Sequence, residues 1–168
     1  AVTSLCGMAF LSAGHTPGRG KYGREVQRAV DFVVSCAQPS GFIVDEGSKS
    51  HGPMYGHGFA TLFLAQAYGM SPKKEVRQAL DKAVKLIVNT QNNEGGWRYA
   101  PERKDADLSV TVCQVMALRA ARNCGLFVPK NTIDKSVEYV KKSQNSDGGF
   151  RYQLVRRADS MFPRSAAG

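Results

Sequence analysis

Three segments of the chain are apolar around nearly the whole helical circumference: residues 1–13, 54–68 and 107–124. A helix of this kind is expected to be covered by protein on all sides. Each segment is followed by a glycine at the position of a helix C-terminal cap: Gly14, Gly69 and Gly125. The pattern therefore predicts three buried helices that end at these glycines.

Three other segments carry apolar residues on one face only: residues 22–37, 72–90 and 130–143. In the middle segment Val76, Leu80, Val84 and Ile87 follow helical spacing, which predicts an amphipathic helix. Ser71-Pro72 is typical of a helix start, with serine as N-cap and proline at the first helical position. Apolar inner helices and amphipathic outer helices thus alternate along the chain.

A nine-residue motif occurs twice, and its copies lie 53 residues apart. The copies at 91–99 and 144–152 share the pattern Gln-x-x-acid-Gly-Gly-aromatic-Arg-Tyr. A repeat of this length indicates a supersecondary unit that is used several times. We expect six full helices in three hairpins, no sheet, and repeats at about 1–53, 54–106, 107–158 and, as a start only, 159–168.

The motif Gln-x-x-x-Gly-x-Trp at 91–97 resembles the QW motif of terpenoid cyclases of the squalene–hopene type, and 144–150 has Phe in place of Trp. The chain is most similar to bacterial prenyltransferase/squalene-oxidase repeat proteins. This resemblance implies an all-α fold, the α/α-toroid, with 1–168 as a single domain. We interpret the motif residues as structural contacts between repeats: Gln91, Gly95, Gly96, Trp97, Gln144, Gly148, Gly149 and Phe150.

The resemblance also suggests a candidate acid. Squalene–hopene cyclases place Asp-x-Asp-Asp before an inner helix, where clustering and burial raise the pKa of one carboxyl. Asp105 and Asp107 match the first two acids, but Leu108 replaces the last. The alternative is that Asp107 or Ser109 is an ordinary N-cap of the helix that follows.

Other polar residues occupy comparable ends of inner helices. Tyr55, His57 and Asp159 are expected on the rim of a common mouth, where they would bind a substrate. The alternative for His57, which stands between two glycines, is a structural role. Protein prenyltransferases and the thioester domains of complement proteins are looser relatives with the same fold. This sequence lacks the zinc-binding pattern of the first and the thioester sequence of the second. No cofactor and no metal site is predicted, because the four cysteines show no ligand spacing.

The net charge of +9 comes largely from lysines and arginines on the amphipathic helices. We interpret them as a solvated outer face, without a nucleic-acid site and with weak attraction to a membrane surface. No apolar run reaches the length of a membrane span. Because three hairpins form an open arc and the chain begins without Met, we expect it to be a segment of a longer chain that packs against further repeats or a second copy.

Two functions remain open from the sequence. One is a terpenoid cyclase-like enzyme, or part of one, with an apolar cavity that binds and cyclises an isoprenoid. The other is a non-catalytic toroid module that binds a protein or a lipid. The fold is common to both, so that the residues around Asp107 have to distinguish them.

Overall fold

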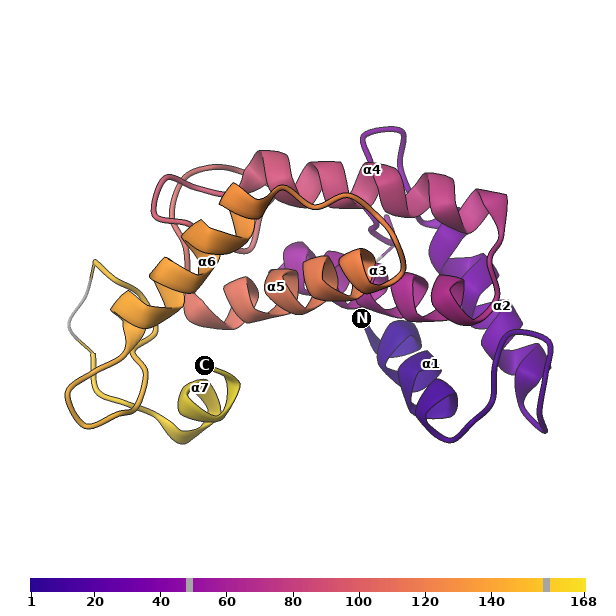
Figure 1. Ribbon diagram of the computed structural model, residues 1–168, viewed down its shortest axis with the longest axis horizontal. Coiled ribbons are helices and arrows are strands. Elements are labelled where there is room, and N and C mark those ends of the chain that lie inside the picture. Colours follow the sequence, from indigo (N-terminus) through magenta and orange to yellow (C-terminus); the bar gives the residue numbers. More distant parts are fainter. Residues whose placement is uncertain (48–49, 156–157) are drawn as a thin grey trace.

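The computed structural model describes residues 1–47, 50–155 and 158–168, and every regular element in them is a helix. The order is α1 (Val2–Ser12), α2 (Gly23–Ser35), α3 (Pro53–Met70), α4 (Lys74–Thr90), α5 (Leu108–Asn123), α6 (Lys130–Ser143) and α7 (Phe162–Ala167). Figure 1 shows α1, α3 and α5 as a layer of inner helices, with α2, α4 and α6 beside them as the outer layer. This arrangement confirms an all-helical α/α-toroid segment.

The inner helices approach one another closely where one of them has a glycine. The pair α3–α5 forms the most extensive helix contact in the described chain. A Cβ atom at Gly58 of α3 would lie 2.8 Å from Gln114 Nε2 and 3.2 Å from Cys113 Cβ of α5. Gln114 Nε2 also donates to the Met54 carbonyl at 2.9 Å. This contact fixes the first turn of α3 against the first half of α5.

Burial follows the predicted division between inner and outer helices in two hairpins but not in the first. Ten of the 18 residues of α3 are buried, which is a larger share than in α4, and α5 likewise exceeds α6. In α1, however, only Ser4, Gly7 and Leu11 of 11 residues are buried. The prediction was wrong for α1 because, among the described helices, only α2 and α3 pack against it.

Helix ends differ from the expected ones in the second hairpin. Gly14 and Gly125 have φ of +86° and +89° and follow α1 and α5, as predicted. Gly69 instead lies inside α3, which ends one residue later. The helix α4 begins at Lys74 with Lys73 as N-cap, so that Ser71-Pro72 belongs to the connection and not to the helix start.

Candidate functional site

Each hairpin ends in a short loop with the same backbone hydrogen bonds. In the first copy of the motif, Asn92 N donates to Gly96 O at 3.0 Å and Gly95 N donates to Asn92 O at 3.2 Å. In the second copy, the corresponding donors are Asn145 and Gly148, with distances of 2.8 and 3.0 Å. Gly95 and Gly148 have φ of +97° and +83°, a conformation that favours glycine.

A third loop of this kind precedes α3, and the sequence analysis missed it. Gln38 N donates to Phe42 O and Gly41 N to Gln38 O, both at 2.9 Å, and Gly41 has φ of +90°. The loop ends in Ile43 where the first motif has Trp97. The only sequence signal is the glycine, 54 residues before Gly95, because the second glycine and the aromatic residue are absent.

The three loops are connected to the next inner helix in the same way. The backbone N–H of the last loop residue donates to a side chain in the helix that follows: Ile43 to His57 Nδ1, Trp97 to Thr111 Oγ1 and Phe150 to Ser165 Oγ, each at 3.1 Å. The acceptors lie 54 residues apart along the chain. We call these three connections the loop–helix joints.

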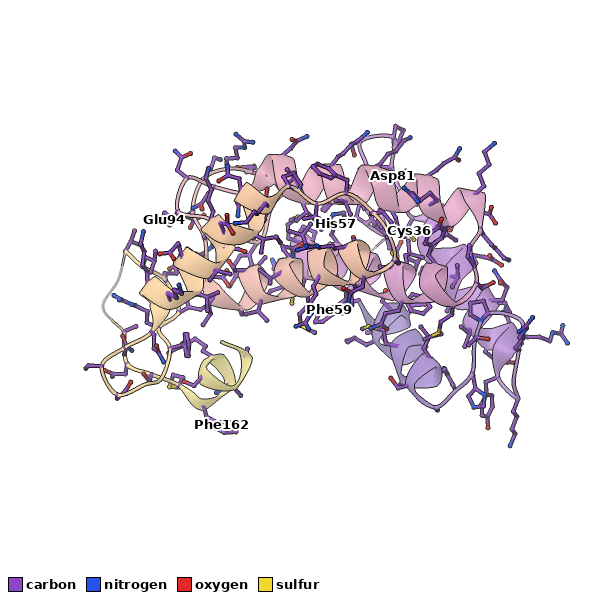
Figure 2. All side chains as sticks on the ribbon, viewed as in Figure 1. Cys36, His57, Phe59, Asp81, Glu94 and Phe162 are labelled. Carbon is purple, nitrogen blue, oxygen red and sulfur yellow. The ribbon has the colours of Figure 1, made fainter. Side chains whose placement is uncertain are left out.

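The structure places His57 in the first of these joints and not on the rim of a mouth. The side chain is 0% exposed, and Figure 2 shows it near the centre of the molecule. Burial lowers the pKa of His57 to about 4, so that the imidazole is neutral around pH 7. His57 thus serves as a hydrogen-bond acceptor in the interior, and the structure does not place it on the rim that the sequence predicted.

Asp107 is the N-cap of α5 and is completely buried. Its Oδ1 accepts from Val110 N at 2.9 Å and from Ser109 Oγ at 2.7 Å. Its Oδ2 is also buried and has no hydrogen-bond partner in the described part of the chain. Capping therefore uses one carboxylate oxygen and leaves the other without a partner.

Tyrosines from three segments gather beside Asp107. The Tyr55 hydroxyl bonds Ser109 Oγ at 2.5 Å, and the hydroxyls of Tyr99 and Tyr152 bond each other. The rings of Tyr55 and Tyr99 lie 6.0 Å apart. Because Ser109 donates its only proton to Asp107, Tyr55 is the donor in the bond to Ser109. A hydrogen-bonded chain thus runs from Tyr55 through Ser109 to Asp107.

The negative charge of Asp107 affects the groups around it. Burial raises the pKa of Tyr55, of Tyr139 and, to about 11, of Cys113, and the nearby Asp107 carboxylate raises each of them further. Tyr139 is 0% exposed and its hydroxyl has no partner in the described residues. Asp107 thus lies in a region of low dielectric that contains weakly acidic groups, and no second carboxylate of the described residues is bonded to it.

Asp105, the second candidate acid, has a different environment. Its carboxylate forms an ion pair with Arg98 at 3.2 Å, and its side chain is 56% exposed. The Arg98 guanidinium lies 4.8 Å from the centre of the Tyr99 ring and 5.8 Å from that of Tyr152. Asp105 therefore holds Arg98 beside these tyrosines, and no hydrogen bond joins its carboxylate to that of Asp107 among the described residues.

Asp159 lies in the loop before α7 and is exposed. Its backbone carbonyl accepts from Arg164 Nη2 at 2.8 Å. No hydrogen bond or ion pair joins it to Asp107, Tyr55 or His57 within the described residues. Of the three residues that the sequence predicted on a common rim, only Tyr55 is connected to Asp107, through Ser109.

A half-open pocket of about 640 Å³ lies at the N-terminal ends of α1 and α3. Its wall is mainly apolar, and it includes Phe32 and Val33 of α2, Ile43, Tyr55 and Tyr99. Tyr55 connects this pocket to the buried acid, because its ring lines the pocket and its hydroxyl begins the chain to Asp107. A pocket of this size and polarity suits an apolar small molecule.

Metal-binding groups do not gather in the part of the chain that the structure describes. No three His, Cys, Asp or Glu side chains there are close enough to hold a metal ion, and all four cysteines are free. Of the helices in the same residues, none combines the length and apolar content that crossing a bilayer requires.

Comparison with known proteins agrees with this architecture. A model of the prenyltransferase alpha-alpha toroid domain family matches residues 4–158. A curated relative, drimenyl diphosphate synthase of Streptomyces showdoensis, is 27% identical over 161 residues. The match covers 96% of this chain but only 28% of the relative, so that the chain spans little more than a quarter of that protein.

Proposed function

Because the chain belongs to the prenyltransferase alpha-alpha toroid domain family, we propose that it contributes an isoprenoid-binding pocket and that Asp107, which is buried beside the pocket behind Tyr55, serves as the acid of a cyclisation. The pocket is the apolar one at the N-terminal ends of α1 and α3. The name of the relative makes polyprenyl diphosphates the first substrate class to test, beside squalene. The reaction would begin when Asp107 protonates a carbon–carbon double bond and leaves a carbocation.

The unpartnered Oδ2 of Asp107 carries this proposal. An N-cap residue needs one side-chain oxygen, which Oδ1 supplies, and an exposed N-cap would satisfy its second oxygen with water. Here the second oxygen is buried, and burial of an unpartnered polar atom costs free energy. Such a cost is typical of groups that a protein keeps for chemistry. A proton on Oδ2 would leave both accepted hydrogen bonds of Oδ1 intact.

The tyrosines provide a second argument. Aromatic faces attract positive charge, and a cyclisation that begins with protonation proceeds through carbocations. Tyr55 and Tyr99 line the pocket, and Arg98 already lies against the ring of Tyr99. We propose that Tyr55 supplies the aromatic face nearest to the reacting chain, since no lysine or arginine among the described residues lies over its ring.

The test is Asp107→Asn in the natural full-length protein, incubated with squalene and polyprenyl diphosphates. Asparagine is as good an N-cap as aspartate, so that its carbonyl oxygen keeps the bonds to Val110 and Ser109. It has no acidic proton to transfer. We expect turnover to fall by about a hundredfold or more, with unchanged thermal stability and unchanged substrate affinity. Turnover equal to that of the parent would exclude Asp107 as the acid.

Two further variants separate the roles. Asp107→Ala removes the cap as well as the acid, and it should also lower the unfolding free energy by about 1–2 kcal/mol. Asp105→Asn keeps Asp107 and weakens only the ion pair with Arg98, so that it should retain most of the turnover. Loss of turnover in Asp105→Asn equal to that in Asp107→Asn would instead support an acid pair.

A specific observation favours the alternative of a non-catalytic module. Leu108, which stands where the resemblance predicts the last acid, is 0% exposed and its amide donates to Tyr152 O at 2.9 Å. Both groups that bond the Asp107 carboxylate belong to its own helix, and neither a histidine nor a second carboxylate among the described residues bonds it. If the full-length protein binds neither squalene nor polyprenyl diphosphates in titration calorimetry, the module interpretation stands and the pocket proposal is wrong.

A further inference from the structure

Asp107 has no direct access to water. Its side chain is 0% exposed, and so are those of its neighbours Leu108 and Val110. The loop after α6 passes beside it, because Leu108 N donates to Tyr152 O at 2.9 Å. A buried carboxylate takes up a proton from a group within hydrogen-bond reach. An acid in this position, which gives a proton away in every turnover, therefore needs a route by which a proton returns to it.

The groups that bond the Asp107 carboxylate differ in whether they can pass on a proton. The described partners of Oδ1 are the backbone N–H of Val110 and the hydroxyl of Ser109. A backbone N–H donates its proton but cannot accept another in exchange, whereas a hydroxyl donates one proton and accepts a second at the same oxygen. Within the described residues, a route to Asp107 therefore has to end at Ser109.

The route begins in the pocket, at Tyr55. Ser109 Oγ donates to Asp107 Oδ1 at 2.7 Å, and Tyr55 Oη lies 2.5 Å from Ser109 Oγ. The two hydroxyls come from α3 and α5, which lie side by side in Figure 1. Tyr55 also lines the pocket. Both hydroxyl protons of this chain are directed from the pocket toward Asp107, which is the arrangement that inward transfer of a proton requires.

We propose that Tyr55 and Ser109 form a proton relay that returns to Asp107 the proton lost by the final carbocation, a role that rests on the cyclisation proposed above. The C–H bond beside the cationic carbon breaks, its electron pair forms the double bond of the product, and its proton goes to Tyr55 Oη. Tyr55 passes its own proton to Ser109 Oγ, and Ser109 passes its proton to Asp107 Oδ1. The carboxyl group is neutral again, so that the reaction consumes no proton overall.

Rotations return the relay to its starting state. After the transfer the proton is on Oδ1, the oxygen that accepts from Val110. A half-turn of the carboxyl group exchanges its two oxygens, and this torsion has a broad two-fold profile. The protonated oxygen then takes the buried position without a partner in the described chain, and the other oxygen accepts from Val110 and Ser109 again. The hydroxyls of Ser109 and Tyr55 rotate back, since their protons are free to turn.

Tyr55 is suited to pass a proton on and not to hold a charge. Burial has the largest effect and raises the pKa of Tyr55, the bond to Ser109 lowers it, and the nearby Asp107 raises it further. The phenol therefore stays neutral around pH 7. Asp45 and His51 also line the pocket and are exposed, and no hydrogen bond or ion pair of the described residues joins them to Asp107. A proton taken up by either of them would be lost to water.

The experiment is rapid-mixing kinetics of the natural full-length protein with squalene and with polyprenyl diphosphates. Ser109→Ala breaks the relay but keeps Asp107 and its cap bond to Val110. We expect a burst of about one product molecule per protein molecule, followed by a steady-state rate about a hundredfold below that of the parent. A Ser109→Ala protein without this burst, or with the steady-state rate of the parent, would overturn the relay.

The same measurement separates the relay from the proposed cyclisation. Asp107→Asn should remove the burst as well as the steady state, because no acidic proton is present for the first turnover. A burst that survives in Asp107→Asn would exclude Asp107 as the acid, and the relay with it. A parent that converts none of the substrates would overturn both proposals. With an active parent and an inactive Asp107→Asn, the outcome for Ser109→Ala concerns the relay alone.

Matched variants distinguish the relay from packing. Tyr55→Phe keeps the ring and should reproduce the burst of Ser109→Ala, whereas Ser109→Thr should restore most of the steady-state rate because it keeps a hydroxyl. Tyr68→Phe in α3 and Ser136→Ala in α6 remove hydroxyls outside the pocket and should behave like the parent. Steady-state losses in these two controls equal to the loss in Tyr55→Phe would show that any missing hydroxyl slows turnover, and would overturn the relay.

Deuterated water tests the origin of the returned proton. If the relay recycles the proton of the substrate, the turnovers after the first should place hydrogen at the carbon that Asp107 protonates. Mass spectrometry of the product should then show less deuterium at this carbon than the solvent contains. Deuterium at the level of the solvent in every turnover would show that water recharges Asp107, and would overturn the return of the substrate's proton.

Discussion

The loops at 91–99 and 144–152 share one sequence pattern but differ in burial. Trp97 is 1% exposed, and its indole Nε1 donates to Ile87 O at 2.8 Å. Phe150, at the same place in the second loop, is only partly buried. The difference arises because α6 packs over the first loop, with Lys135 against Gly95, whereas nothing in the described chain lies within 4 Å of a Cβ placed at Gly148 in the second.

The glutamines show the same contrast in hydrogen bonds. Gln91 Nε2 donates to Gly95 O in its own loop and to Thr132 O at the start of α6, both at 2.9 Å. Within the described residues Gln144 Nε2 donates only to Gly148 O, at 3.1 Å, and its side chain is exposed. One bond of the motif therefore lies within the loop, and the other requires the next hairpin.

The first glycines of the two motifs complete the comparison. A Cβ atom at Gly95 would collide with the backbone carbonyl of Lys135 in α6, whereas a Cβ at Gly148 would meet nothing within 4 Å. Gly41, in the earlier loop, meets the carbonyl of Lys82 in α4 in the same way as Gly95 meets Lys135. The motif is thus a connection between successive hairpins, and its contribution to stability depends on the helix that covers it.

The largest expected effect distinguishes the two aromatic residues. Trp97→Ala empties a fully buried site and removes the bond to Ile87, so that the unfolding free energy should fall by about 3–5 kcal/mol. Phe150→Ala removes a partly exposed ring and should cost about 1–2 kcal/mol. Urea unfolding of both variants measures the difference. Equal costs would contradict the dependence on the covering helix.

A smaller effect concerns the loop–helix joint at Ile43. Its hydrogen-bond acceptor is His57, whereas the acceptor in the joint at Trp97 is Thr111. The pKa of His57 is lowered to about 4 in the folded protein from 6.5, so that the unfolded chain binds a proton first on acidification. The unfolding free energy should therefore fall as pH drops from about 6.5 to about 4, by about 3 kcal/mol in total.

The variant His57→Thr tests this assignment, because threonine supplies an acceptor without a titrating group. The pH dependence of its stability between about 4 and 6.5 should be flatter than that of the parent. His51→Gln, at an exposed position, should leave the dependence unchanged. An identical slope in His57→Thr and the parent would mean that carboxylates alone cause the acid sensitivity.

Much of the fold followed from the sequence because the repeated pattern and the helical periodicity indicate the same unit. The alternation of inner and outer helices and the burial of Trp97 are confirmed. The earlier loop at 37–43 was not predicted, because it keeps the backbone hydrogen bonds with only one glycine of the motif. Backbone geometry is retained there by residues that share little chemistry with the later copies.

The candidate site was predicted less well, since its contacts join residues from different hairpins. Asp107 was identified as both N-cap and candidate acid, and the cap is confirmed. The chain from Tyr55 through Ser109, however, depends on how α3 and α5 cross, which no spacing rule reports. His57 was expected on the rim because it lies near the start of an inner helix. The structure instead uses it as the acceptor of a loop–helix joint, at the position that Thr111 and Ser165 fill in the later joints.

The smallest predicted difference tests the comparison most directly, because it concerns one residue type in one motif. Gln91→Ala leaves two buried carbonyl groups without their donor, those of Gly95 and Thr132, so that the unfolding free energy should fall by about 1–3 kcal/mol. Gln144→Ala removes one exposed bond that water replaces, and should cost no more than about 0.5 kcal/mol. Chemical unfolding of both variants under the same conditions gives the two values. If Gln144→Ala proved as costly as Gln91→Ala, the bond within the loop would account for the contribution of the glutamine, and the contact with α6 would add nothing.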